Sequence, residues 1–345
     1  MRTWALVGLF VLAALTALAF ARDVVLPVVM AFVLSLVFAP VVRGLRRVHV
    51  PQALGAGVVV LGLVGAAATG VANLADPAGD WLTKAPQYVR EVIPKLRRLS
   101  QPVQEVKKAT EQVARMSTEI AGTKQPVQEV TVRAPSMEST IIDGLQNFAF
   151  ATISMLVLLY YFLASGDLFL RKIVEVTPRL SDKKRAVDIS RQIESEVSSY
   201  LFTVTVINVL LGCAVALAMY AMHVPNPVLW GVMVGTFNFI PYLGDIGSFA
   251  VLTVVGLLSF HDLGRALMVP GVFYILTATE GYLITPRVLG HRLDLNPVVI
   301  VLSVLFWGWM WGILGAILAV PVLVAIKVFC DRVEPLQGFG EFLAG

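Results

Sequence analysis

Charged residues are scarce in this chain: they make up only 14% of its 345 residues, against about 25% in soluble domains. Apolar residues make up 57%, and the mean hydropathy is +0.79. This composition excludes a disordered chain and argues against a soluble globular one. It indicates an integral membrane protein, for which membrane lipid is the first partner.

Cysteine and histidine are scarce as well, with two and four residues respectively. Cys213 and Cys330 lie in or beside apolar runs; they cannot form a disulfide framework, and neither has the spacing of a zinc site. The net charge of +4 is too small to indicate nucleic-acid binding. No Gly-x-x-x-x-Gly-Lys-Ser/Thr loop occurs, which argues against ATP hydrolysis. We therefore expect no cofactor, no metal and no nucleic-acid partner.

Residues 1–73 are expected to form an N-terminal membrane segment of three helices, because a helix that crosses a bilayer needs about 20 mostly apolar residues. The runs 4–21 and 24–42 are nearly continuous and predict a helical hairpin. A cleavable signal peptide is the alternative for the first run. A short arginine-rich loop follows and is expected in the cytoplasm. The third span, 53–73, is rich in Gly and Ala.

The stretch 74–146 interrupts this pattern, because it is charged, contains proline and lacks a long apolar run. We expect a soluble helical insertion on the extracytoplasmic side, since long loops are translocated largely regardless of their charge. A fourth span follows at 147–164. Residues 165–199 carry charges of both signs and an apolar edge, which predicts cytoplasmic amphipathic helices at the membrane surface.

The C-terminal part of the chain shows signs of an internal repeat. Asn226-Pro227-Val228 recurs as Asn296-Pro297-Val298, 70 residues later. A single span precedes each motif, and each is followed by an apolar run too long for one simple crossing. The expected parts of this region are a first unit of span and broken hairpin at 200–260, a second such unit at 261–332, and a cytoplasmic tail at 333–345.

Both apolar runs are interrupted near the middle, at 238–247 and 308–315, and the two breaks coincide under the 70-residue offset. Either a long kinked helix that crosses the membrane or a re-entrant hairpin fits each run. We favour hairpins, because they keep the basic stretch 285–295 in the cytoplasm and make the units an inverted repeat, a transporter architecture. Prolines and glycines are expected to shape the breaks and the turn between the units: Pro241, Gly244, Gly247, Pro286, Gly290, Gly308, Gly312 and Gly315.

Two acidic residues, Asp245 and Glu280, are expected at membrane depth. A carboxylate there indicates an ion or proton pathway. Glu280 is the better proton carrier if Asp245 lies at a half-helix N-terminus, where the helix dipole stabilises its charge. The alternatives are structural: Glu280 reaches the interface or pairs with Arg287, and Asp245 caps the half-helix.

Two amides complete the candidate pathway together with one aromatic residue. Asn208 and Asn238 can contact a polar, hydroxyl-rich solute, and their alternative role is hydrogen bonding between helices. Tyr242 lies in the same break as Asn238. The candidate pathway residues are therefore Glu280, Asp245, Asn238, Asn208 and Tyr242.

Four motifs occur in order in the C-terminal part of the chain: Asn-Phe-Ile-Pro-Tyr-Leu-Gly at 238–244, Glu-Gly-Tyr-Leu-Ile-Thr-Pro-Arg-Val-Leu-Gly at 280–290, Leu-Asn-Pro at 295–297, and Gly-Ile-Leu-Gly-Ala-Ile-Leu-Ala-Val-Pro at 312–321. Together they resemble the autoinducer-2 exporter family of bacterial inner-membrane proteins. The resemblance extends to the N-terminal spans and covers nearly the whole chain except 74–146.

The resemblance implies secondary transport by a homo-oligomer, with members linked to export of autoinducer-2 or to exchange of sodium or lithium for protons. The chain departs from the family at Asp245, where proline is usual. This departure adds an ionisable group beside the broken helix.

An enzyme and a scaffold are the competing classes. Gly244-Asp245 matches the Gly-x-Gly-Asp of intramembrane aspartyl proteases only in part, and no His-Glu-x-x-His or Gly-x-Ser-x-Gly motif occurs. A non-transporting scaffold would leave the broken helices unexplained. We therefore predict an all-α polytopic inner-membrane transporter, not an enzyme, with both termini cytoplasmic. It moves a small, autoinducer-2-like solute with protons or Na⁺ as candidate coupling ions; a Na⁺(Li⁺)/H⁺ antiporter is the alternative.

Overall fold

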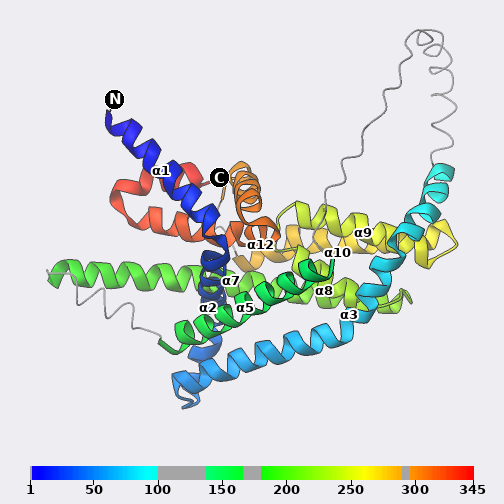
Figure 1. Cartoon of the computed structure of the whole chain (residues 1–345), viewed down its shortest axis with the longest axis horizontal. Helices are drawn as coiled ribbons and strands as arrows, with labels where there is room; N and C mark the ends of the chain where they lie inside the picture. Colours follow the sequence, from blue (N-terminus) through cyan, green and yellow to red (C-terminus); the bar gives the residue numbers. More distant parts are fainter. Residues whose placement is uncertain (1, 100–136, 166–179, 290–294) are drawn as a thin grey trace, which may run out of the picture.

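The computed structural model describes residues 2–99, 137–165, 180–289 and 295–345. These residues are helical apart from short turns and contain no strand, which confirms the all-α class (Figure 1). Six helices in this part of the chain are long and apolar enough to cross a membrane: Arg22–Arg47, Gln52–Lys84, Phe148–Ser165, Ser190–Ala221, Leu263–Val288 and Pro297–Arg332.

The first two helices, α1 (Arg2–Phe20) and α2 (Arg22–Arg47), do not form the predicted hairpin. The backbone N–H of Ala21 donates to the carbonyl of Ala17, and that of Val25 donates to the carbonyl of Ala21. Helical hydrogen bonds therefore continue across the junction, and one residue is too short for the reversal that joins antiparallel helices. Figure 1 shows α2 continuing from the end of α1.

The third helix, α3 (Gln52–Leu99), is 48 residues long and continues past residue 73, where the sequence places the end of a span. Loss of apolar residues marks where the helix leaves an apolar layer, whereas the helix itself continues because charged residues are good helix formers in water. α5 (Met137–Ser165) runs back beside α3, and Gln52 Nε2 donates to the carbonyl of Leu163 at 3.0 Å. Residues 100–136 of the expected insertion lie outside the described residues.

The long helix α7 (Leu180–Ala221) is continuous across residue 200, so the amphipathic segment and the fifth span are parts of one helix. Residues 166–179 lie outside the described residues. Arg43 of α2 pairs with Glu194 of α7 at 3.2 Å, and Arg332 pairs with Glu196. Farther along α7, apolar packing joins the same elements through Leu36, Val37, Val197, Leu201, Val320, Val324 and Val328.

Helices α7 and α8 (Pro227–Phe237) approach each other closely through small residues. A Cβ at Gly212 would lie 2.7 Å from the carbonyl oxygen of Gly231, and a Cβ at Gly231 would overlap the carbonyl oxygen of Gly212. Small residues allow this approach, and van der Waals packing stabilises helix pairs in lipid. α8 is thereby fixed along α7.

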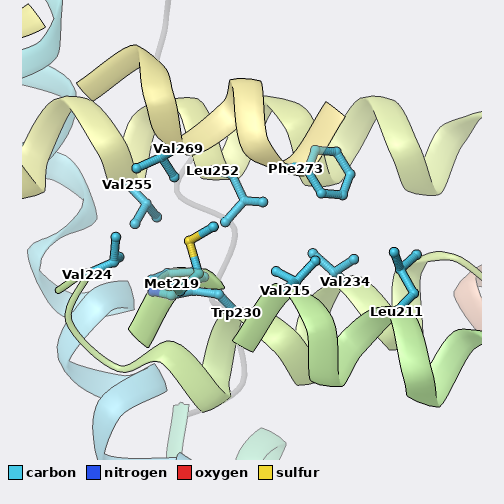
Figure 2. Packing of buried hydrophobic residues seen from close by; sticks show 10 residues of the cluster. All are labelled: Leu211, Val215, Met219, Val224, Trp230, Val234, Leu252, Val255, Val269 and Phe273. Atoms are coloured by element: carbon cyan, nitrogen blue, oxygen red, sulfur yellow. The ribbon is translucent and has the colours of Figure 1, made fainter. Parts of the chain in front are cut away.

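The fold then turns back through α9 (Leu243–Ser259) and α10 (Leu263–Thr279). Figure 2 shows apolar side chains of α7 and α8 facing those of α9 and α10. Asp262 caps α10 by accepting a hydrogen bond from the backbone N–H of Arg265 at 3.0 Å. The shared core consists of Leu211, Val215, Met219, Val224, Trp230, Val234, Leu252, Val255, Val269 and Phe273.

After α10 the chain forms a π-helical turn, η1 (Glu280–Ile284), and the short helix α11 (Thr285–Leu289). α12 (Pro297–Arg332) follows, then η2 (Glu334–Leu336) and α13 (Gln337–Leu343). The backbone N–H of Asn296 donates to the carbonyl of Leu343 at 3.0 Å. The residue just before α12 and the C-terminal helix that follows it are therefore neighbours.

Candidate functional site

The first break separates α8 from α9 and contains a strained turn. The backbone N–H of Leu243 donates to the carbonyl of Pro241 at 2.7 Å, while Tyr242 has φ 62° and ψ −50°. This is a γ-turn with positive φ, a rare and strained conformation. A Cβ at Gly244 would overlap the carbonyl oxygen of Phe237, so the return of the chain requires glycine there. Gly247 is under no such constraint, because its Cβ would lie 3.6 Å from the Phe237 ring.

The second break lies inside α12 at Gly312, which has φ 69° and ψ −149°. Only glycine adopts this region readily. Ser303 Oγ donates to the carbonyl of Ala319 at 3.1 Å, although a straight helix would separate these residues by about 24 Å. The two arms of α12 therefore fold back on each other, as the hairpin interpretation requires. A Cβ at Gly308 would lie 3.7 Å from the Cβ of Ala316, an ordinary contact between the two arms.

The two breaks share the same close contact between a glycine and a backbone carbonyl group. A Cβ at Gly315 would overlap the carbonyl oxygen of Trp307, much as a Cβ at Gly244 would overlap that of Phe237. Trp307 and Phe237 are 70 residues apart, which is the offset of the sequence repeat. Each hairpin thus closes by packing a glycine against a carbonyl group near the end of its first arm.

The first break also contacts the second hairpin. Ile240, in the first break, packs against a small cluster formed by the two arms of α12. The cluster consists of Val304, Ala316 and Ala319, with Trp307 beside them. One hairpin therefore presents its break to the arms of the other.

The two candidate amides are paired with each other. Asn238 Nδ2 donates to Asn208 Oδ1 at 2.9 Å, which joins the first break to the middle of α7. This is the helix-to-helix hydrogen bond that we weighed as their structural role. Asn208 is only 2% exposed, and within the described part of the chain its own Nδ2 has no hydrogen-bond partner. One buried donor is therefore left over for another acceptor.

The two candidate carboxyl groups lie at the starts of two different segments. Asp245 lies in the first turn of α9, and Glu280 begins the π-helical turn after α10. The charge of Asp245 acts on the carboxyl group of Glu280. Arg287 does not neutralise Glu280; its Nη1 donates to the carbonyl of Leu283 at 3.2 Å. Glu280 instead accepts a hydrogen bond from the hydroxyl of Thr285.

Thr285 is the partner of Glu280 that the sequence analysis did not identify. It stands five residues after Glu280, and this spacing does not place two side chains on one face of an α-helix. The sequence signal that could have indicated the pairing is Pro286, which we expected only to shape the turn between the two units. Tyr242 is 49% exposed, and Gly290 lies outside the described residues.

Broken helices with polar groups at their breaks, set within a bundle of apolar helices, define a polytopic membrane transport protein. A family model described as "AI-2E family transporter" matches residues 9–334. The chain belongs to this family, as the sequence motifs indicate.

Its curated relatives are named as transport proteins. The chain is similar to the AI-2 transport protein TqsA of Escherichia coli, with 24% identity over 94% of this chain and 90% of the relative. It is 25% identical to the putative transport protein YueF of Bacillus subtilis over 88% and 82% of the two chains. It is 24% identical to the putative transport protein YhhT of Escherichia coli over 91% and 86%. These names support the prediction of a transporter and not an enzyme.

Proposed function

We propose that this protein is a secondary transporter that moves a small polar solute across the bacterial inner membrane, along the two breaks. The observation that carries the proposal is that Ile240 of the first break packs on the arms of the second hairpin. Irregular backbone at membrane depth persists only where protein buries it or where it lines a cavity. A broken segment that packs on a second broken helix therefore favours a solute path over a scaffold.

The solute that suits the site is rich in oxygen atoms. The Asn208 Nδ2 group is a buried hydrogen-bond donor without an acceptor among the described residues. Leaving such a donor unsatisfied costs about 1–3 kcal/mol of stability. Hydroxyl and carbonyl oxygens of a small sugar-like molecule meet this need. TqsA, at 24% identity, is named as a transport protein for AI-2, so an autoinducer-2-like solute is our first choice.

Coupling to protons or Na⁺ rests on the two carboxyl groups. The charge of Asp245 acts on Glu280, and two carboxylates that repel each other favour uptake of a proton or a cation. The same pair supports the second candidate function, a Na⁺(Li⁺)/H⁺ antiporter. The two functions differ in whether an organic solute moves as well.

The membrane arrangement that fits this function has two re-entrant hairpins of opposite orientation. The first, α8 and α9, enters from the extracytoplasmic side, and the second, α12, enters from the cytoplasmic side, where the C-terminal tail lies. The neighbouring positions of Asn296 and Leu343 support this arrangement of α12. We further propose a homo-oligomer, as the family resemblance implies.

The test is transport in proteoliposomes that carry a pH-sensitive dye. Imposed Na⁺ or Li⁺ gradients should move protons in the wild type, and the substitution Glu280→Gln should abolish the movement because it removes the titratable group. Glu341→Gln, an exposed acid on α13, is the matched control and should behave as the wild type. Autoinducer-2 uptake is measured in the same vesicles. If neither protons nor autoinducer-2 move in vesicles that hold folded protein, the proposed function is wrong.

A further inference from the structure

The helix that carries Glu280 changes its geometry at that residue. The backbone N–H of Thr285 donates to the carbonyl of Glu280, a bond that spans five residues and defines a π-helical turn. Pro286 supplies the cause, because its ring clashes with the carbonyl four residues earlier and it has no N–H to donate in an α-helix. The wider turn relieves this clash. π-helical turns inside α-helices are frequent at functional sites.

The π-helical turn determines which side chain reaches Glu280. In an α-helix, side chains five residues apart are rotated from each other by about 140°. In the wider turn Thr285 comes round to Glu280, and its hydroxyl donates to Glu280 Oε1. The other carboxylate oxygen, Oε2, is left for a proton or a cation.

The hydroxyl of Thr285 donates to a different kind of acceptor from the hydroxyls of other threonines in these helices. Thr279, one residue before the turn, donates to the carbonyl of Ile275 at 2.7 Å. Thr253 and Thr205 donate likewise to the carbonyls of Phe249 and Leu201, four residues earlier. Such bonds to the residue's own helix are the default for threonine. Thr285 is directed to a carboxylate instead.

We propose that Thr285 is a positioning residue for Glu280, which fixes the orientation of the carboxylate and stabilises its charged form between transport steps. The inference rests on the proposed function, because it takes Glu280 to be the coupling group. A hydroxyl that donates to a carboxylate favours the ionised form and fixes its orientation. Release of this bond accompanies protonation of Glu280.

The surroundings of Glu280 contain few other charges. α9 contributes Asp245 as its one charged residue, and the apolar part of α7, residues 200–221, contributes none. α11 contributes Arg287, which is engaged with the carbonyl of Leu283, and Arg265 lies at the opposite end of α10. Among the groups of these elements, the bond from Thr285 and the charge of Asp245 therefore act on Glu280, in addition to its burial.

The test compares Thr285→Val, which keeps the shape and removes the hydroxyl, with Thr285→Ser, which keeps the hydroxyl. Infrared difference titration of the purified protein in lipid vesicles follows the carboxyl band that is absent in Glu280→Gln. In Thr285→Val this band should titrate at a pH higher by roughly 0.5 to 1 unit, because a bond that stabilises the charged form is lost. In Thr285→Ser and in the control Thr279→Val, the band should titrate at the same pH as in the wild type.

Proton movement driven by a Na⁺ gradient is measured in parallel. Thr285→Val should lower the initial rate about tenfold and shift its pH profile, whereas Thr285→Ser and Thr279→Val should do neither. Equal titration curves for Thr285→Val and Thr285→Ser would overturn the inference. A loss of rate in Thr285→Val without a shift of the pH profile would also overturn it, because the role would then be merely structural. Failure of the proposed function itself would appear separately, as the absence of both proton movement and autoinducer-2 uptake in the wild type.

Discussion

In the proposed function, the side chain of Asn208 serves both packing and transport. It is buried in α7, accepts a hydrogen bond from Asn238 and keeps an unpaired Nδ2. A hydrogen bond between helices in a membrane contributes only about 0.6 kcal/mol, whereas an unpaired buried donor costs about 1–3 kcal/mol. Stability alone therefore does not favour an amide at this position. A transient acceptor, such as a passing solute, gives it a function.

We predict that Asn208→Leu separates these roles. The substitution should lower the free energy of unfolding by no more than about 1–3 kcal/mol, because it deprives Asn238 Nδ2 of its acceptor but also removes the unpaired Nδ2 of Asn208. Uptake of a polar solute should fall about tenfold, because the free donor is gone. Thermal unfolding and vesicle uptake measure the two effects. Asn73→Leu is the control, because Asn73 Nδ2 donates only to the carbonyl of Thr69 in its own helix. Unchanged uptake in Asn208→Leu would remove Asn208 from the pathway.

At the residue scale, the sequence could identify candidates but not their partners. Asp245 and Glu280 could be selected because charged residues are scarce in apolar runs. The bond between Asn208 and Asn238 spans 30 positions and follows from the path of the chain through the first break, which no local pattern encodes. Thr285 could not be found because the spacing that links it to Glu280 exists only in a π-helical turn.

At the scale of elements, the close contact of α7 and α8 fixes one arm of the first hairpin. Gly231→Ala should lower the free energy of unfolding by about 1–3 kcal/mol, since the new Cβ would overlap the carbonyl of Gly212 and lie 2.7 Å from the Cβ of Ala216. Gly271→Ala, on α10, is the matched control, because a Cβ there meets nothing within 4 Å. Thermal unfolding in detergent compares the two. Equal melting temperatures would show that the helices can separate at no cost.

The boundaries of helices can be predicted from the sequence only where proline or glycine alters the backbone conformation. Proline and glycine in the runs located both breaks, and Gly312 marks the second one to the residue. The ends of α3 and α7 could not be located in this way, because a change from apolar to charged residues marks the end of an apolar layer and not the end of a helix. The expected N-terminal hairpin was wrong for a related reason. Arg22 and Asp23 interrupt the apolar run but continue the helix.

In the molecule as a whole, α7 connects the N-terminal helices to the two hairpins. Its polar half forms ion pairs with Arg43 of α2 and Arg332 of α12, and its apolar half packs along α8. Arg43 lies near the basic C-terminal end of α2 and Arg332 ends α12, so these helix ends and residues 194–196 lie at one level. Because basic residues favour the cytoplasmic side, this level is the cytoplasmic boundary in the proposed arrangement.

Cysteine labelling in vesicles tests the arrangement of the two hairpins. Cys213 and Cys330 are first replaced by alanine, and single cysteines are then introduced by His261→Cys, Arg287→Cys and Glu341→Cys. Re-entrant hairpins place position 261 on the extracytoplasmic side, because α8 and α9 then enter and leave by the same face. Position 287 should react with an impermeant reagent from the same side as position 341. If the two apolar runs crossed the membrane instead, each of the first two positions would exchange sides, while 341 would keep its own. Labelling of position 261 together with 341 would therefore contradict the hairpin arrangement, and with it the inverted repeat on which the proposed solute path depends.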